Sequence, residues 1–336
     1  MISIKDVARH AGVSVGTVSN VINRPDLVST DTRARVTAAI GELGYVRSES
    51  ARQLRAGRSR MVALLVLDMG NPFFVDVARG AERAARSAGL NVILCNSGQD
   101  AAEESEYLSL FAEQRVRGLL VTPADASGAN LSSFRRHKIP YVLVDRLGPA
   151  DESCSVSVDD VVGGELAVRH LTGGGHTRIA YISGPRSLAQ CEDRRRGGQA
   201  ALAEAGLPPS ALTVLEVEHM DVSSGRDAGA RLLGLAQRPT AVFCVNDLVA
   251  LGVLQAMFAA GVRVPEEMSI VGYDDIEFAA AAAVPLTSVR QPAFRIGQTA
   301  AELLIEETGD GADQHDHRRV VFQPELVVRS SSLTRR

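Results

Sequence analysis

The chain has 336 residues, of which 45% are hydrophobic, 23% are charged and 4% are aromatic. This length fits roughly two or three domains that each bury a core, and the composition excludes a disordered, collagenous or coiled-coil protein. The net charge of −4 argues against a nucleic-acid partner, but only as an average over the whole chain.

The charge is distributed unevenly along the chain. Residues 1–60 carry 10 basic and 5 acidic side chains, a net charge of +5. Subtraction from the totals of 36 basic and 40 acidic residues leaves 26 and 35 in the rest of the chain, a net charge of −9. A small basic head joined to a large acidic body indicates a polyanionic partner for the head.

The 4 cysteines are far apart in the sequence, and none belongs to a C-x-x-C or C-x-x-H pair. We therefore expect neither a disulfide framework nor a zinc site. The N-terminus lacks the apolar core of a signal peptide, and no apolar run approaches the roughly 20 residues that span a bilayer. These observations predict a cytoplasmic protein without a membrane partner.

Three short helices are predicted in the head. Apolar residues recur with helical spacing over 4–11, and Gly12 can adopt the positive φ that ends a helix. Ser14 is a good N-cap for a second helix, Ser29 is one for a third, and Gly44 ends the third helix. Apolar side chains on the inner faces of these helices provide the core of a small bundle.

The first two helices have the form of a helix-turn-helix, in which the second helix enters the major groove of DNA. Val15 can touch a thymine methyl group, and Asn20 can pair with the edge of an adenine. A plain helical hairpin is the alternative, which the positive charge of the head disfavours. The candidate DNA-binding residues of this helix and its cap are Ser14, Val15, Gly16, Thr17, Ser19, Asn20 and Asn23.

Residues 47–58 form a polar, arginine-rich segment. A helix of about ten residues is marginal alone in water, so we expect this segment to become ordered on DNA. Its arginines, such as Arg52, and the apolar Leu54 suit a minor-groove binder that inserts a wedge between base steps. A flexible linker between domains is the alternative interpretation.

Beyond residue 58, apolar runs of strand length alternate with amphipathic helical stretches. The first set has predicted strands at 61–67, 91–95, 118–121 and 141–144, and helices at 73–87 and 103–115. The second set has strands at 155–158, 179–182, 213–217, 241–245 and 269–271, and helices at 161–171, 191–205, 224–236 and 248–260. A last helix is expected at 296–306, and short strands at 320–322 and 326–328. This alternation predicts an α/β fold with two doubly wound lobes and a ligand crevice between them, at the carboxyl ends of the strands.

One segment, IKDVARHAGVSVGTVSNVIN at 4–23, closely resembles the signature of the lactose-repressor/galactose-repressor family of bacterial transcription regulators. Later motifs in the same order extend the resemblance over essentially the whole chain, among them Asn71-Pro72-Phe73-Phe74, Val144-Asp145-Arg146, Val245-Asn246-Asp247 and Pro285-Leu286-Thr287-Ser288-Val289-Arg290-Gln291. The resemblance implies a helix-turn-helix head at 1–46, a hinge at 47–58 and a two-lobed body of the periplasmic-binding-protein type I at 59–336. It places the first lobe at about 59–157 plus 291–319 and the second at about 158–290 plus 320–336.

The function implied by this resemblance is that of a repressor controlled by a small effector, which we expect to be a sugar or a sugar derivative. Such a regulator binds palindromic double-stranded operator DNA as a homodimer, with the two hinges paired in the minor groove and Leu54 as the wedge.

The candidate effector-binding residues follow predicted strand ends. Phe73 and Phe74 can stack on a sugar ring, although packing on the helix face explains at least one of them. The carboxylates of Asp145 and Asp247 can accept hydrogen bonds from adjacent hydroxyl groups. The resemblance further assigns effector contacts to Arg195, Met220 and Gln291.

No motif of the chain indicates catalysis. A G-x-S-x-G, an H-E-x-x-H and a phosphate-binding loop are all lacking, so we expect neither an enzyme nor a bound cofactor. His315-Asp316-His317 is a possible metal ligand set, but a solvated loop tip is the interpretation we favour. Two other classes compete with a regulator. The missing signal peptide weighs against a periplasmic sugar receptor, and the missing dinucleotide fingerprint after 61–67 weighs against a nucleotide-binding oxidoreductase.

Overall fold

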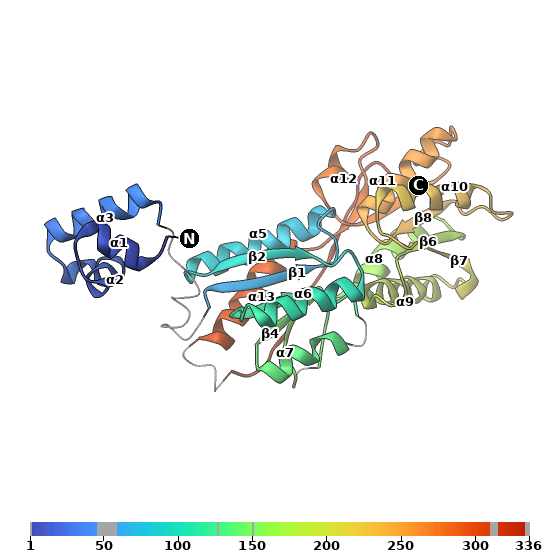
Figure 1. Cartoon of the computed structure of the whole chain (residues 1–336). Helices are drawn as coiled ribbons and strands as arrows, with labels where there is room; N and C mark the ends of the chain where they lie inside the picture. The colour runs from blue at the N-terminus through green and yellow to red at the C-terminus, as the bar shows by residue number, and fades with distance from the viewer. Residues whose placement is uncertain (1, 46–58, 126–127, 150, 310–314, 333–336) are drawn as a thin grey trace. The chain divides into compact units, whose positions relative to one another are not determined.

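The computed structural model describes residues 2–45, 59–125, 128–149, 151–309 and 315–332 (Figure 1). The chain divides into two units, Met1–Arg58 and Ser59–Arg336, each of which is described by itself. The predicted hinge at 47–58, with Arg52 and Leu54, lies outside the described residues. None of the helices in the described ranges combines the length with the apolar character that crossing a bilayer demands.

The first unit contains the three predicted helices: α1 (Ile4–Ala11), α2 (Val15–Asn23) and α3 (Thr30–Leu43), with a 3-10 turn at Pro25–Leu27. The helix ends are those that the sequence predicts. Gly12 and Gly44 take φ values of 65° and 61°, and the Ser14 hydroxyl accepts a hydrogen bond of 3.0 Å from the backbone N–H of Thr17. The helices bury a common core of Val7, Ala8, Ala11, Val18, Val21, Val36 and Ala39.

Within its described residues, the second unit contains two six-stranded sheets. The first sheet has the order β11 (Arg319–Phe322), β5 (Cys154–Val158), β4 (Tyr141–Val144), β3 (Gly118–Val121), β1 (Met61–Val66) and β2 (Asn91–Asn96), with neighbouring strands parallel. The second sheet has the order β12 (Glu325–Val327), β10 (Thr287–Arg290), β9 (Ser269–Asp274), β8 (Ala241–Cys244), β6 (Ile179–Ser183) and β7 (Leu212–Glu216). Only the edge strand β12 pairs antiparallel in the described part of this sheet.

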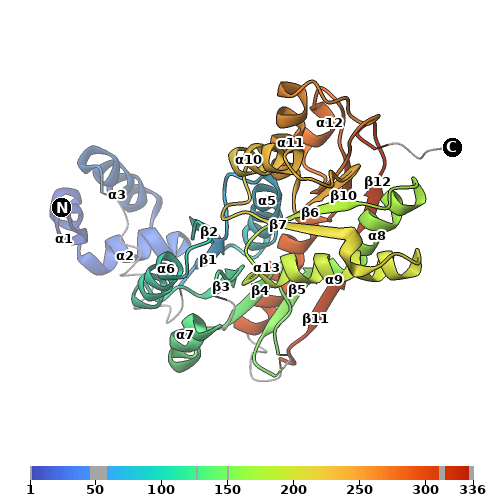
Figure 2. The ribbon, with the colours of Figure 1, turned by 90° about the vertical axis from the view of Figure 1, so that its right-hand side faces the viewer.

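Helices cover both faces of each sheet, as Figures 1 and 2 show. The first sheet lies between α5 (Pro72–Ser87) and α13 (Ala293–Thr308) on one face and α6 (Ala101–Glu113) and α7 (Ser132–His137) on the other. The helices of the second lobe are α8 (Asp160–Gly173), α9 (Ala189–Glu204), α10 (Val222–Leu233), α11 (Asp247–Ala259) and α12 (Glu277–Ala281). The predicted doubly wound α/β architecture is therefore confirmed.

The described backbone passes between the lobes at three points: after β5, after β10 and between β11 and β12. The last crossing corrects the expected lobe boundary at 319/320. Val320 pairs with Val156 in parallel register, so β11 is an edge strand of the first sheet and the tail enters the second lobe only with β12. Three short elements were not predicted from the sequence. β10 contains one apolar residue in four, unlike the apolar strands at 118–121 and 141–144, and the helices α7 and α12 are too short to show a helical period.

Glycines allow the paired helices of the body to approach very closely. A Cβ atom at Gly297 of α13 would lie 1.9 Å from the carbonyl oxygen of Val77 in α5, and one at Gly80 would lie 2.0 Å from that of Phe294. The same reciprocal arrangement joins α8 to α9 and α10 to α11. Since these contacts are made by backbone atoms, no side-chain rotation can make room for a methyl group.

We predict that Gly297→Ala lowers the stability of the body by about 1–3 kcal/mol, the usual cost of overpacking a core. The matched control is Gly173→Ala in α8, where an added Cβ would meet nothing within 4 Å. This control should be neutral or stabilising by up to about 1 kcal/mol, because alanine is the better helix former. Thermal unfolding of the two variants tests the prediction, and equal melting temperatures would contradict it.

Candidate functional site

Helix α2 carries the candidate DNA-binding surface of the first unit. Its cap is rigid, because the hydroxyls of Ser14 and Thr17 lie 2.9 Å apart and the Ser14 oxygen also accepts from the backbone. At the other end, the Asn23 amide donates to the carbonyl oxygen of Ser19 at 2.8 Å. These contacts fix the ends of the helix before any partner is bound.

The middle of the α2 surface is small and accessible. Val15 is 38% exposed, Gly16 has no side chain, and the exposed Asn20 amide has no hydrogen-bond partner among the described residues. A low surface of this kind allows a helix to lie deep in the major groove. Exposed cations of the same unit can contact phosphates: Lys5, Arg9, Arg24, Arg33 and Arg35.

The body has a pocket between its lobes. It opens where the carboxyl ends of strands and the first turns of helices from both sheets meet, the usual place for a ligand in such folds. The lining residues are Leu67, Asn71, Phe73, Phe74, Asp145, Gln190, Arg194, Met220, Asn246 and Asp274.

A buried arginine is the one cationic side chain among the residues that line this pocket. The Nε atom of Arg194 donates to Asp160 at 2.7 Å, and its NH1 group donates to the carbonyl oxygen of Val245 at 2.7 Å. The guanidinium also stacks on the ring of Tyr273, 3.6 Å from its centroid, and the Tyr273 hydroxyl donates to Asp160 at 3.0 Å. With Arg194 only 4% exposed, this network holds the guanidinium in one orientation.

Asp274 connects the two lobes across the pocket. Its carboxylate accepts hydrogen bonds from the amides of Asn71 in the first lobe, at 2.9 Å, and of Gln291, at 2.8 Å. Asp274 has a φ of 99°, a left-handed conformation that costs energy for a residue with a side chain. Burial raises the pKa of Asp274 to about 6, although the nearby Arg194 and the two amides oppose this shift.

Two polar atoms near the pocket have no hydrogen-bond partner among the described residues: Oδ1 of Asp145 and Oε1 of Gln291. Both residues are 4% exposed, so water reaches these oxygens poorly. Burial also raises the pKa of Asp145 well above its usual range. Buried acceptors without partners are costly, and donors of a bound ligand would satisfy them.

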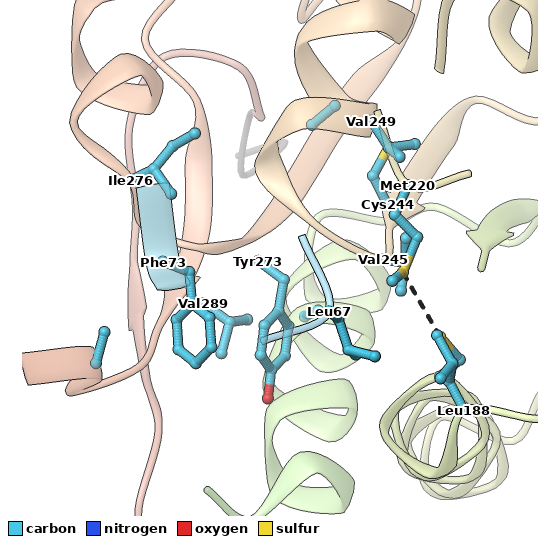
Figure 3. Packing of buried hydrophobic residues seen from close by; sticks show 14 of the residues in the cluster. Leu67, Phe73, Leu188, Met220, Cys244, Val245, Val249, Tyr273, Ile276 and Val289 are labelled. Carbon is cyan, nitrogen blue, oxygen red and sulfur yellow. Dashed lines mark hydrogen bonds between the residues drawn. The ribbon is translucent and has the colours of Figure 1, made fainter. Parts of the chain in front are cut away.

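The apolar walls of the pocket come from both lobes. Phe73 and Phe74 pack edge to face at a centroid distance of 5.0 Å. Opposite them, Met220 fills the space beside Gly184, where a Cβ atom would lie 2.5 Å from its sulfur. Figure 3 shows side chains of both lobes in one buried cluster, including Leu67, Phe73, Tyr273 and Val289.

The predicted effector residues do not all line the pocket. Four of them do: Phe73, Phe74, Asp145 and Met220. Gln291 does not line the pocket itself, but its amide donates to Asp274, which does. Arg195 does not, because it lies one residue later on α9 and pairs with Glu192 on the half-exposed side of the helix. Arg194 therefore replaces Arg195 in the candidate site.

Asp247 does not line the pocket either. It is fully buried and accepts hydrogen bonds from the Ser288 hydroxyl at 2.7 Å and the Ile276 backbone at 2.9 Å, which makes it a structural link rather than part of the lining. Its neighbour Asn246 lines the pocket instead, caps α11 and donates to the carbonyl oxygen of Met220 at 2.9 Å.

Five further lining residues were not predicted from the sequence: Leu67, Asn71, Gln190, Asn246 and Asp274. Two of them had a usable signal, since Asn71 and Asn246 each follow an apolar strand and precede a helix, as an N-cap does.

The chain matches two protein families. Residues 3–48 match bacterial regulatory proteins of the lacI family, and residues 168–332 match the periplasmic binding protein-like domain. The HTH-type transcriptional repressor PurR of Aliivibrio fischeri (strain MJ11) is 39% identical over 341 residues, which cover 100% of this chain and 99% of that protein.

Two solved structures extend the likeness. The complex of the transcriptional regulator CelR with cellobiose has a TM-score of 0.74 and 32% identity, and the match covers 99% of this chain and 100% of that one. The lac repressor dimer bound to operator and the anti-inducer ONPF has a TM-score of 0.82 and 27% identity, with 99% of each chain covered.

The raised pKa of Asp274 leads to a prediction about pH. The folded protein binds this proton more tightly than the unfolded chain, where the pKa is near 3.8, so the stabilising contribution is lost as the pH rises from about 4 to about 6. Asp274→Asn should therefore gain stability relative to the wild type over this window, by up to about 3 kcal/mol.

Thermal unfolding of the two ligand-free proteins at constant ionic strength measures this difference. Asp227→Asn, a change at an exposed carboxylate of α10, is the control and should differ from the wild type by a constant amount. The same constant difference for Asp274→Asn across the window would contradict the prediction.

Proposed function

This chain belongs to the lacI family of bacterial regulatory proteins, and we propose that its pocket binds a small polyhydroxylated effector that controls how the head binds operator DNA. The chain is a DNA-binding repressor under effector control and not an enzyme. One observation carries the proposal for the pocket. The amide of Asn71 and the carboxylate of Asp274 belong to different lobes and join across it, so a molecule bound there contacts both lobes at once.

For the operator contacts, we propose that Val15, Gly16 and Asn20 read base edges and that Ser14, Thr17, Ser19 and Asn23 orient the helix. The accessible Asn20 amide and the low surface around Gly16 support this division. Arg52 and Leu54 of the hinge remain predictions from the sequence, since they lie outside the described residues.

We further propose that two chains bind one palindromic operator, with one head on each half-site. The related lac repressor binds its operator as a dimer, and two-fold symmetric proteins read two-fold symmetric sites. Because the operator lies on bacterial DNA, we place the protein in the cytoplasm.

A sugar or sugar derivative is the effector class that the pocket favours. The pocket offers hydrogen-bond acceptors on Asp145, Asp274 and Asn246 and a donor on Arg194. Each hydroxyl group of a sugar can both donate and accept a hydrogen bond, so adjacent hydroxyl groups can pair with both kinds of partner. The aromatic side chains come from the first lobe only, which suits one face of a sugar ring, whereas a flat base is usually held between two rings. The CelR relative was solved with a sugar, cellobiose.

A purine base is the second candidate for the effector, because the relative from Aliivibrio fischeri is a PurR repressor. A planar base would have to stack between Phe73 or Phe74 and the sulfur of Met220.

The control mechanism we propose is a shift between two arrangements of the lobes. An effector that bridges Asp274 and Arg194 to the first lobe favours the closed arrangement by its differential affinity for the two states. That difference, typically about 1–3 kcal/mol, is the largest change in operator affinity that the effector can produce.

We predict that a screen of sugars, sugar phosphates and nucleobases finds a stabilising sugar. A ligand at a hundred times its Kd adds about 2.7 kcal/mol of stability, which is several degrees in melting temperature. Arg194→Lys should lower the affinity for this sugar by about 10- to 100-fold, because lysine cannot reproduce the planar contacts with Asp160 and Val245.

Arg195→Lys on the same helix is the matched control and should bind as the wild type does. Calorimetric titration measures both affinities, and circular dichroism checks that both variants fold. A purine that stabilises the wild type while all sugars fail would overturn the sugar proposal, and equal effects of the two variants would remove Arg194 from the site.

For the head, we predict that Asn20→Ala weakens binding to the specific operator by about 10- to 100-fold, which corresponds to the loss of one bidentate base contact. Binding to unrelated DNA should not change, because that binding depends on phosphate contacts. Thr37→Ala, at an exposed position on α3, is the control and should leave both affinities unchanged. Gel-shift titrations of the wild type and both variants on the two DNAs, at one salt concentration, give all six affinities. A parallel loss on specific and unrelated DNA would contradict a reading role for Asn20.

A further inference from the structure

Four potential metal ligands converge at one end of the first lobe, one from position 154 and three from positions 307–317. We call them the β5–β11 cluster: Cys154, Glu307, His315 and His317. Each contributes one ligand atom, and these atoms all lie within 4.8 Å of one another. From the sequence alone we favour a solvated loop tip for residues 315–317. Cys154 lies 161 positions from His315 along the chain and forms no sequence motif with it.

The pairing of the strands explains why these residues meet. Arg319 of β11 pairs with Ser155 of β5, so the residues that precede β11 run beside Cys154, the first residue of β5. The two histidines are separated by one residue and both contribute a ligand atom to the cluster, while Asp316 between them is exposed.

Glu307 reaches the cluster from the last turn of α13. The site therefore draws on a strand, a helix end and the segment that enters a second strand.

The distances fit a tetrahedral metal site. The Cys154 sulfur lies 3.1 Å from Nε2 of His315 and 4.0 Å from Nδ1 of His317. In a tetrahedral zinc site with bonds of about 2.0–2.3 Å, the ligand atoms are about 3.3–3.8 Å apart. These two separations bracket this range, and the other ligand atoms lie within 4.8 Å of one another, so side-chain movements of up to about 1 Å would complete the site.

The cluster also has unmet bonding capacity. The Oε2 atom of Glu307 is buried and has no hydrogen-bond partner among the described residues. The Cys154 side chain is 0% exposed, and the backbone N–H of Arg318 donates to its sulfur at 3.3 Å. An N–H group directed at a sulfur atom is a common feature around metal-bound thiolates. A divalent cation would satisfy the orphaned carboxylate oxygen and balance the charges of one thiolate and one carboxylate.

We propose that the β5–β11 cluster binds one Zn²⁺ ion. The donor set of one sulfur, two imidazole nitrogens and one carboxylate oxygen suits this borderline-soft ion, whereas Mg²⁺ and Ca²⁺ require oxygen ligands. Four protein ligands fill a tetrahedral shell, so the ion is structural and not catalytic. It ties β5 and the start of β11 to the end of α13.

The position separates this site from the effector pocket. Neighbouring strands of the first sheet are parallel. Cys154 at the start of β5 therefore lies at the same end of the sheet as Met61 at the start of β1. The pocket lies at the opposite end of the sheet, beyond the carboxyl ends of the strands. Zinc should therefore stabilise the edge where the chain enters the body without contacting the effector.

The test uses the full chain, stripped of metal with a chelator and titrated with Zn²⁺ alone against a chromophoric competitor. We expect one Zn²⁺ per chain, with binding at least a hundredfold weaker in Cys154→Ser and His317→Ala. The matched controls are Cys95→Ser and His219→Ala, which change the same residue types outside the cluster and should bind as the wild type does. Should Cys154→Ser fail to fold, Glu307→Gln, which keeps the side-chain size, replaces it with the same expected loss.

Two further measurements test whether the bound ion has tetrahedral geometry with a thiolate ligand and whether it stabilises the fold. Co²⁺ in place of Zn²⁺ should give the intense visible bands of a tetrahedral site and a thiolate charge-transfer band in the near ultraviolet, and the latter should vanish in Cys154→Ser. Zn²⁺ should raise the melting temperature of the wild type and not that of His317→Ala. Absence of stoichiometric Zn²⁺ binding, or equal binding by ligand and control variants, would overturn the proposal.

Discussion

The close approach of glycine-bearing helices is the constraint on which the body depends. A Cβ atom at Gly164 of α8 would lie 2.0 Å from the carbonyl oxygen of Arg194 in α9, and one at Gly197 would lie 1.9 Å from that of Val161. Only backbones in direct contact can bring the first turn of α8 and the middle of α9 close enough for Arg194 to reach Asp160 at 2.7 Å. The packing of this helix pair therefore sets the position of the main cation in the pocket before any ligand arrives.

The pocket region buries one cation and three carboxyl groups, so its charges are not matched. Arg194 faces Asp160 directly, while Asp145 and Asp274 lie near enough to feel its field, and burial raises the pKa of all three carboxyl groups. One cation cannot compensate three carboxylates in a dry site, so a ligand rich in hydroxyl donors lowers the cost of keeping them ionised. In the proposed mechanism this gain is largest when both lobes contact the ligand, which links effector binding to lobe closure.

The features that the sequence could predict are those that local chemistry determines. Gly12, Ser14 and Gly44 define the helix ends of the head through their own backbone and side-chain preferences, and all three behave as predicted. The misses concern tertiary placement. On α9, a difference of one residue turns a side chain by about 100°, so Arg194 points into the pocket and Arg195 away from it. No local pattern distinguishes the two, and none could bring Cys154 beside His315.

The three crossings between the lobes restrict how the lobes can move. Two lobes joined by one connecting segment can rotate freely and separate, whereas lobes joined by three such segments are held to a common axis through the connections. Large twists or translations would stretch at least one crossing, so opening and closing about this axis is the motion of low cost. The three connections thus act as a hinge made of backbone. In the proposed mechanism, a ligand that closes the lobes about this axis moves the far end of the first sheet in one defined direction, and little of its binding free energy is spent on other motions.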